Sequence, residues 1–171
     1  MKYGRTFGAI SRDSRVESMR IALGSDHAGY DLKDHLAALL REWGYEVVDL
    51  GTDSGAHSVD YPDFGAAVGR CVVAGDADLG LCICGTGIGI AIAANKVAGV
   101  RAATVHDVTS AHLAREHNHA NVLCLGARVT GPVVAEEALR AWLDAVPGTG
   151  RHIERIEKIN ELDRLLVEQE R

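Results

Sequence analysis

Residues 79–89 read LGLCICGTGIG, from Leu79 to Gly89, and this stretch decides the fold class. Its first six residues are apolar or small and have the length of a buried strand, and the glycines that follow are typical of a tight turn. From about residue 87 to 97, apolar side chains recur three or four positions apart, which predicts a helix. The stretch therefore predicts a strand, a glycine loop and a helix in succession.

The same succession recurs on both sides of this stretch. Short apolar runs alternate with amphipathic stretches of helical length, which is typical of a parallel sheet covered by helices on both faces. The expected strands are 20–25, 46–50, 79–84, 100–105 and 121–126. The expected helices are about 28–43, 62–75, 87–97, 108–117 and 132–146. The sequence therefore predicts an α/β fold with a five-stranded parallel sheet.

The two ends of the chain depart from this alternation. Residues 1–18 mix charges with scattered Gly and Ser, so they are expected to form a flexible or artificial leader outside the fold. At the other end, about residues 150–170 carry Ile and Leu at helical spacing among many charges, which predicts an amphipathic C-terminal helix that needs a partner surface. Residues 19–171 are expected to form a single domain, because a chain of this size buries one ordinary core.

Composition excludes several classes of partner. The net charge of −6 and the pI near 5.7 argue against binding to nucleic acid or to an anionic membrane, since both need an excess of Lys and Arg. No stretch approaches the ~20 apolar residues of a membrane span, and no signal peptide is evident, so a cytoplasmic location is expected. The four cysteines lack paired CxxC spacing and are expected to be reduced thiols.

The glycine loop after the third expected strand is suited to an anion. Its backbone N–H groups can point at a phosphate or a developing oxyanion, although a tight turn without a ligand explains the glycines equally well. Two sequence signatures of nucleotide binding are not met in this chain. Residues 24–29 have the glycine spacing of a Walker A loop, but Tyr30 and Asp31 stand where Lys and Ser or Thr are required. The first turn also lacks the dinucleotide pattern G-x-G-x-x-G.

Cys84 is the thiol that adjoins the glycine loop. At this position helix N-terminal amides can stabilise its thiolate, which then accepts a proton from carbon; a buried thiol that only fills space is the alternative. Metal binding is not expected, because neither Cys82 with Cys84 nor the histidines near His117 have an established ligand spacing.

The remaining candidates each have a structural alternative. Asp26 can cap the first helix, whereas His27 beside it can hold a phosphate. His117 can satisfy helix carbonyls or transfer protons near neutral pH. Arg151 and Arg155 lie four residues apart and can present two guanidinium groups to phosphate oxygens, or they can pair with nearby glutamates, and Arg128 has the same ambiguity.

Taken together, these motifs closely resemble the type B ribose-5-phosphate isomerases, within a group that includes galactose-6-phosphate isomerase subunits. The resemblance covers about residues 19–160 and keeps the motifs in order. It rests on Gly24-Ser25-Asp26-His27-Ala28-Gly29, Asp60-Tyr61-Pro62, Cys84-Gly85-Thr86-Gly87-Ile88-Gly89 with Ala93-Ala94-Asn95-Lys96, His117-Asn118, and Gly150-Arg151-His152 with Arg155.

The resemblance implies a three-layer Rossmann-like sandwich, a homodimer or homotetramer whose sites are shared between subunits, and no metal or organic cofactor. It also implies roles for residues of this chain. Cys84 is the base that moves the proton between C1 and C2, His117 opens the sugar ring, and Thr86 binds the enediolate oxygens. Substrate and phosphate contacts are implied for Asp26, His27, Tyr61, Gly85, Gly87, Ile88, Gly89, Asn118, Arg128, Arg151 and Arg155.

The residue types agree with these implied roles. Interconversion of an aldose and a ketose phosphate needs an acid–base group, a base beside the carbon and a site for the oxyanion. The expected activity is therefore isomerisation of ribose 5-phosphate and ribulose 5-phosphate. The alternatives are the same chemistry on allose 6-phosphate, galactose 6-phosphate or a tetrulose phosphate, and a sugar-phosphate-binding protein without catalysis.

Overall fold

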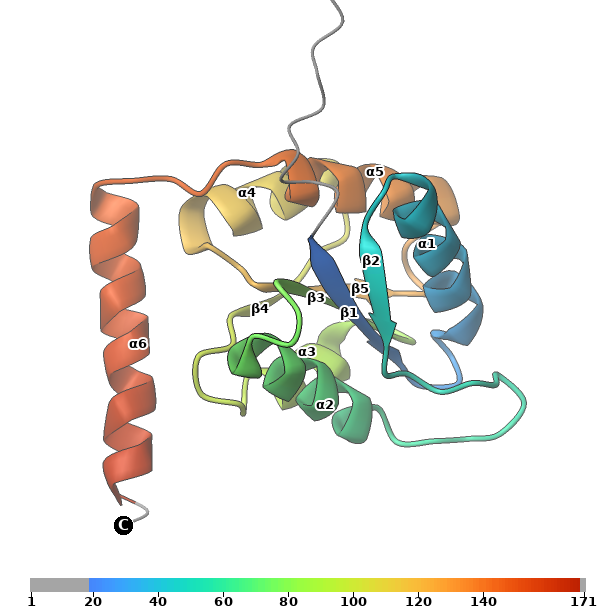
Figure 1. Cartoon of the computed structure of the whole chain (residues 1–171), viewed down its shortest axis with the longest axis horizontal. Helices are drawn as coiled ribbons and strands as arrows, with labels where there is room; N and C mark the ends of the chain where they lie inside the picture. Colours follow the sequence, from blue (N-terminus) through green and yellow to red (C-terminus); the bar gives the residue numbers. More distant parts are fainter. Residues whose placement is uncertain (1–18, 170–171) are drawn as a thin grey trace, which may run out of the picture.

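The computed structural model describes residues 19–169, where five strands alternate with five helices and a sixth helix follows (Figure 1). The expected leader, residues 1–18, lies outside the described residues. The strands are β1 (Arg20–Ser25), β2 (Glu46–Asp49), β3 (Leu79–Cys84), β4 (Ala102–Thr104) and β5 (Val122–Gly126). The helices are α1 (Tyr30–Glu42), α2 (Tyr61–Ala74), α3 (Ile88–Ala94), α4 (Val108–Asn118), α5 (Pro132–Asp144) and α6 (Arg151–Gln169).

All five strands belong to one parallel sheet in the order β2-β1-β3-β5-β4. The register pairs Ile83 with Ser25 on one side and with Leu125 on the other, and it pairs Cys84 with Gly126. The loops that follow β1, β3 and β5 therefore leave the sheet at one edge. The predicted five-stranded parallel sheet is confirmed.

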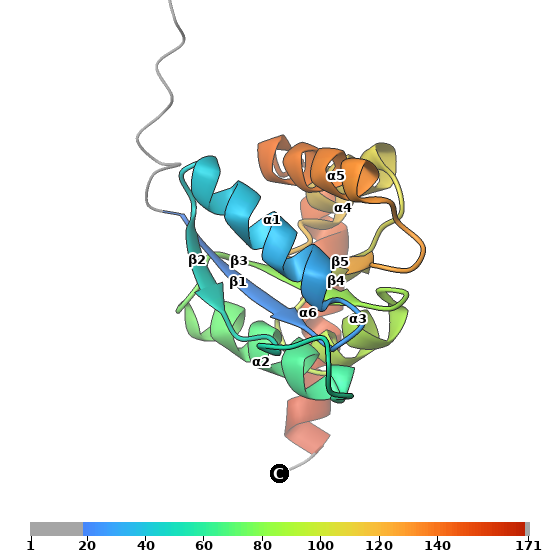
Figure 2. The same ribbon diagram turned by 90° about the vertical axis from the view of Figure 1, so that its right-hand side faces the viewer.

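Helices cover both faces of the sheet, which gives three layers (Figure 2). One face packs against α1, α4 and α5 around a core that includes Leu36 and Trp142, both fully buried. The other face packs against α2 and α3 around a smaller core that includes Val68 and Ile90. The apolar character of the strands follows from this burial on both sides, because β1 and β3 face helices on either surface.

Two elements are markedly shorter than the sequence predicts. The expected strand 100–105 contributes only the three residues of β4, an edge strand whose outer side bonds to no further strand but to Asn95. Its side-chain amide donates to the Ala102 carbonyl at 2.9 Å and accepts the Ala102 N–H at 2.8 Å. The expected helix 87–97 shortens to α3, since Gly87 has a φ of +78° and the chain turns after Ala94.

The C-terminal helix α6 stands beside the body of the molecule, on the side away from the arrowheads of β1 and β2 (Figure 1). Asp163 accepts the N–H of Gly99 at 2.8 Å, and Ile156 is buried. Other apolar side chains of α6 remain exposed: Ile153, Ile159, Leu162 and Leu165. The predicted amphipathic helix is confirmed. Among residues 19–169, no helix is long and apolar enough to span a membrane.

Candidate active site

Cys84 ends β3, and its thiol is buried directly beneath the glycine loop. The N–H of Gly87 donates to the Cys84 Sγ at 3.2 Å. Gly87 is also the residue that caps α3, so the amide that holds the sulfur begins the helix. Thr86 Oγ1 is exposed and accepts the N–H of Ile88 at 3.3 Å. The predicted strand, loop and helix therefore bring a thiol, a hydroxyl and several amides together.

Two glycines of this region are required by the backbone geometry. Gly87 has a φ of +78°, and a Cβ there would lie 2.8 Å from the carbonyl carbon of Leu125. Gly126 at the end of β5 has no room for a Cβ either, since it would lie 2.5 Å from the carbonyl carbon of Thr86. The loop after β3 is thus packed backbone to backbone against the end of β5, which fixes the position of the Cys84 sulfur.

The turn after β1 contributes Asp26 and His27 to the same edge. Asp26 is buried, and its Oδ1 accepts the N–H of Gly29 at 3.0 Å, so its carboxylate shapes the entry to α1. The Asp26 N–H donates to the Ile83 carbonyl at 3.3 Å, which places this turn beside the end of β3. His27 is half-buried, and its Nδ1 lies within hydrogen-bond distance of the Val59 backbone.

Tyr61 and Arg128 reach the glycine loop from two further elements. Tyr61 begins α2, and its ring packs so closely on Gly89 that a Cβ there would lie 2.7 Å from ring carbons. Arg128 is exposed, and its guanidinium lies over Gly85, where an added Cβ would come 3.4 Å from Nη1. The N–H of Arg128 also donates to the Gly85 carbonyl at 2.9 Å.

We call this group the Cys84 cluster. It unites the predicted site residues that follow strands or begin α2 and α3: Asp26, His27, Tyr61, Cys84, Gly85, Thr86, Gly87, Ile88, Gly89 and Arg128.

His117 and Asn118 lie at the opposite edge of the sheet. They end α4, which runs back from the carboxyl end of β4 toward the amino end of β5. Three residues after Asn118, the Asn121 carbonyl accepts the N–H of Gly80 at 2.8 Å, at the start of β3. Cys84 lies four residues after Gly80 along β3, a rise of about 13 Å. Within one chain the sheet therefore separates His117 and Asn118 from Cys84.

The start of α6 joins this second group. The His152 ring stacks on His117 with their centroids 4.5 Å apart, and the N–H of Gly148 donates to the Glu116 carbonyl at 2.8 Å. Arg151 and Arg155 are exposed on the first turns of α6. We call His117, Asn118, Arg151 and Arg155 the His117 cluster.

The two clusters are chemically complementary. The Cys84 cluster offers a thiol that can act as a base and polar groups that can bind developing oxyanions. The His117 cluster offers an imidazole suited to proton transfer and two guanidinium groups suited to a phosphate. Within one chain, however, these two sets of groups lie at opposite edges of the sheet.

The other three thiols are structural in character. Cys82 and Cys124 are fully buried neighbours on β3 and β5, and burial raises the pKa of Cys124 well above its usual range. Cys71 lies half-buried on α2, and burial raises its pKa as well, with the nearby Asp76 adding to the effect. All four cysteines are free thiols, as predicted. Among residues 19–169, no group of three or more His, Cys, Asp or Glu side chains is arranged to hold a metal ion.

Several residues that support the Cys84 cluster were not anticipated. Thr104, at the end of β4, donates its hydroxyl to the Gly87 carbonyl at 3.1 Å. Lys33, which is buried, forms an ion pair with the exposed Asp49 below the β2–α2 loop. A polar residue at the end of an apolar strand signals Thr104 in the sequence, and a lysine on the apolar face of an amphipathic helix signals Lys33.

Comparison with known proteins gives a consistent result. The model of a family described as Ribose/Galactose Isomerase matches residues 21–159. Ribose-5-phosphate isomerase B of Escherichia coli is 46% identical over 144 residues, which cover 84% of this chain and 96% of that protein.

Two solved structures share the fold. Ribose-5-phosphate isomerase B of Clostridium thermocellum superposes with a TM-score of 0.85 at 49% identity, over 86% of this chain and 99% of that one. The Mycoplasma genitalium ribose-5-phosphate isomerase B, solved with bound ribulose 5-phosphate, has a TM-score of 0.82 at 41% identity. The match covers 85% of this chain and 97% of the Mycoplasma genitalium chain. The predicted three-layer Rossmann-like sandwich is thereby confirmed.

Proposed function

Because the chain belongs to the Ribose/Galactose Isomerase family, we propose that it interconverts ribose 5-phosphate and ribulose 5-phosphate through an enediolate. The observation that carries the proposal is the Cys84 thiol, which the Gly87 N–H holds at the end of β3 among groups that can bind oxyanions. A protein that only bound a sugar phosphate would need no base at this position.

The reaction begins at C2 of the open-chain aldose. The Cys84 thiolate takes the proton from C2, and the electron pair of the broken C–H bond forms the C1–C2 double bond of the enediolate while O1 gains the negative charge. Thr86 and the loop amides stabilise that charge. A proton moves from O2 to O1, Cys84 returns its proton to C1, and C2 becomes the carbonyl carbon of the ketose.

The His117 cluster opens the sugar ring before this proton transfer and supplies further contacts to the substrate. His117 opens the furanose ring by relaying the proton of the C1 hydroxyl to the ring oxygen, so that the C1 carbonyl forms as the bond from C1 to the ring oxygen breaks, and Asn118 binds the sugar. Arg151 and Arg155, with Arg128 of the Cys84 cluster, bind the hydroxyls and the phosphate. Since the two clusters lie at opposite edges of one sheet, we propose that a second copy of the chain supplies the His117 cluster to each site.

A complementation assay tests the shared site. In a symmetric dimer, Cys84→Ala and His117→Ala are each inactive, but a mixed dimer has one site with both residues intact. Unfolding and refolding an equal mixture should restore about a quarter of the wild-type activity, because half of the dimers are mixed and each has one good site. A mixture that stays inactive, although native electrophoresis shows mixed dimers, would contradict the shared site.

The chemistry is tested by turnover of ribose 5-phosphate, with ribulose 5-phosphate measured directly. Cys84→Ala should abolish turnover while circular dichroism and thermal unfolding remain close to wild type. Cys71→Ala is the matched control, since it removes a half-buried thiol on α2 and should retain full activity. Near-normal turnover by Cys84→Ala would refute the role of the thiol.

The family description names two sugars, which makes a hexose phosphate the second candidate. Comparing kcat/KM for ribose 5-phosphate, galactose 6-phosphate, allose 6-phosphate and a tetrulose phosphate decides between them. Incubation of each sugar phosphate in deuterium oxide separates catalysis from binding alone, since proton exchange at C2 requires a base and a simple binder incorporates no deuterium.

The proposal also includes the setting of the enzyme. Residues 19–171 act as one catalytic domain, and the protein works in the cytoplasm, because sugar phosphates are charged and do not cross membranes unaided. Fractionation of cells that produce the native chain would test the location.

A further inference from the structure

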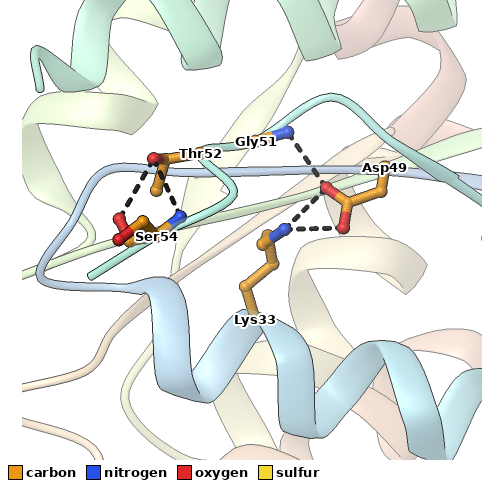
Figure 3. A network of polar contacts seen from close by, with 5 residues as sticks. All are labelled: Lys33, Asp49, Gly51, Thr52 and Ser54. Carbon is orange, nitrogen blue, oxygen red and sulfur yellow. Dashed lines mark hydrogen bonds and ion pairs between the residues drawn. The ribbon is translucent and has the colours of Figure 1, made fainter. Parts of the chain in front are cut away.

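The β2–α2 loop, residues 50–60, runs along the edge of the sheet beside the Cys84 cluster, and an ion pair holds its start. Lys33 on α1 is only 2% exposed, and its Nζ lies 2.7 and 2.6 Å from the two carboxylate oxygens of Asp49. Asp49 Oδ1 also accepts the N–H of Gly51 at 3.0 Å (Figure 3). The buried Lys33 ammonium therefore fixes the Asp49 carboxylate, which in turn holds the first turn of the loop through the Gly51 N–H.

A backbone hydrogen bond also holds the loop against β1. The N–H of Thr52 donates to the Ser25 carbonyl at 3.2 Å, at the end of β1. The Thr52 hydroxyl donates to the Ser54 carbonyl at 3.1 Å, which keeps the next residues folded back (Figure 3). Beyond this point most of the loop is exposed, so its course depends on these few bonds.

The far end of the loop contacts His27. The Val59 nitrogen lies 3.2 Å from His27 Nδ1, and the Val59 carbonyl oxygen lies 3.3 Å from the same atom. A neutral ring that accepts the Val59 N–H at Nδ1 carries its proton on Nε2, whereas the other tautomer would set two N–H groups against each other. A protonated ring can donate from Nδ1 to the Val59 carbonyl. Nε2 carries a proton in both states.

From these contacts we infer that Lys33 and Asp49 are positioning residues for His27. By anchoring the β2–α2 loop, they hold the Val59 peptide against Nδ1, so that His27 presents an Nε2–H donor to an oxygen of the sugar phosphate. The identity of that ligand rests on the proposed function, whereas the coupling of the loop to the ring does not.

Nitrogen-15 NMR of the histidine rings and steady-state kinetics test this inference on the full-length protein. The His27 signals are assigned by their loss in His27→Gln. In the wild type, Nδ1 should show the shift of an unprotonated ring nitrogen. In Lys33→Met, the two ring nitrogens should move toward averaged shifts as the tautomers mix. The KM for ribose 5-phosphate should rise about tenfold with kcat within about twofold.

Glu136→Gln is the matched control. It weakens another ion pair of α1, between His35 and Glu136 at 2.7 Å, which does not involve the β2–α2 loop. This variant should leave the His27 signals and the KM unchanged. If Lys33→Met fails to fold, Asp49→Asn, which retains the side-chain size, is measured by the same readouts with the same expectation.

The inference is overturned if the folded variant is less stable but keeps the wild-type His27 shifts and the wild-type KM, because Lys33 would then serve stability alone. Absence of turnover in the wild type would instead overturn the proposed function. The ring spectra need no substrate, so they decide the coupling of loop and ring in that case as well.

Discussion

Gly87→Ala tests whether the backbone of the glycine loop sets the activity of Cys84. Gly87 has a φ of +78°, where an alanine costs about 1–2 kcal/mol. Its Cβ would also lie 2.8 Å from the Leu125 carbonyl carbon and 3.1 Å from the Gly126 nitrogen. These are backbone atoms that cannot rotate away, so the loop itself must shift by several tenths of an ångström. We expect a total destabilisation of about 2–4 kcal/mol.

The same shift acts on the proposed role of Cys84, because the Gly87 N–H holds the Cys84 Sγ at 3.2 Å. Small misplacements of a reacting group cost up to about 100-fold in rate, and we expect kcat/KM to fall by about that factor. Urea unfolding and turnover of ribose 5-phosphate measure the two effects on the same preparation.

Gly75→Ala is the matched control for this variant. Gly75 has nearly the same φ, +79°, but a Cβ there meets nothing within 4 Å. It should therefore show the backbone cost of about 1–2 kcal/mol with full activity. Equal stabilities of the two variants, together with wild-type turnover by Gly87→Ala, would refute the reasoning that the packing of this loop positions the thiol.

Three further outcomes follow from individual contacts. Asp107 accepts the N–H of Ser110 at 2.8 Å, which lowers the pKa of its carboxyl, so Asp107→Ala should lower the Tm at neutral pH; this deficit should begin to shrink below about pH 4, the ordinary pKa of Asp, and should vanish only below the lowered pKa, where the native wild-type carboxylate is protonated. Burial raises the pKa of Cys124, so iodoacetamide at pH 7 should alkylate this thiol in urea but not in the native protein, as peptide mass mapping would show. His119 has a φ of +47° and donates from Nε2 to the Gly148 carbonyl at 2.7 Å, so His119→Gly should stay within about 1 kcal/mol of wild type while His119→Ala, which keeps the strain and loses the bond, is about 1 kcal/mol less stable by urea unfolding.

The fold was predictable because its signals are local. Each buried strand except β4 carries its own apolar run, and each helix its own apolar face, so element types and order follow from periodicity. The contact at the outer side of β4 was not predictable, because it is made by the Asn95 side chain, which bonds to the backbone of Ala102. That contact exists only once α3 and β4 are packed together.

The sequence predicts that the residues of the Cys84 cluster gather at the carboxyl ends of the strands, but it does not predict the contacts that support them. The glycine loop can be recognised from the spacing of its glycines. The contact between Val59 and His27, by contrast, joins residues 32 positions apart, and the loop that connects them has no periodic pattern. The ion pair of Lys33 and Asp49 is similar, because each residue alone has an ordinary surface interpretation. Only the packing of α1 against β2 buries the lysine.

The separation of Cys84 from His117, by contrast, follows from the order of elements alone. In a parallel sheet every strand runs in one direction, and every covering helix returns in the other. Residues that follow a strand therefore lie at one edge, and residues that end a helix lie at the other. Cys84 ends β3, whereas His117 and Asn118 end α4, so no single copy of such a chain can close both around one small sugar. This division of acid–base residues between strand ends and helix ends is the structural support for the proposal that two copies of the chain share each site.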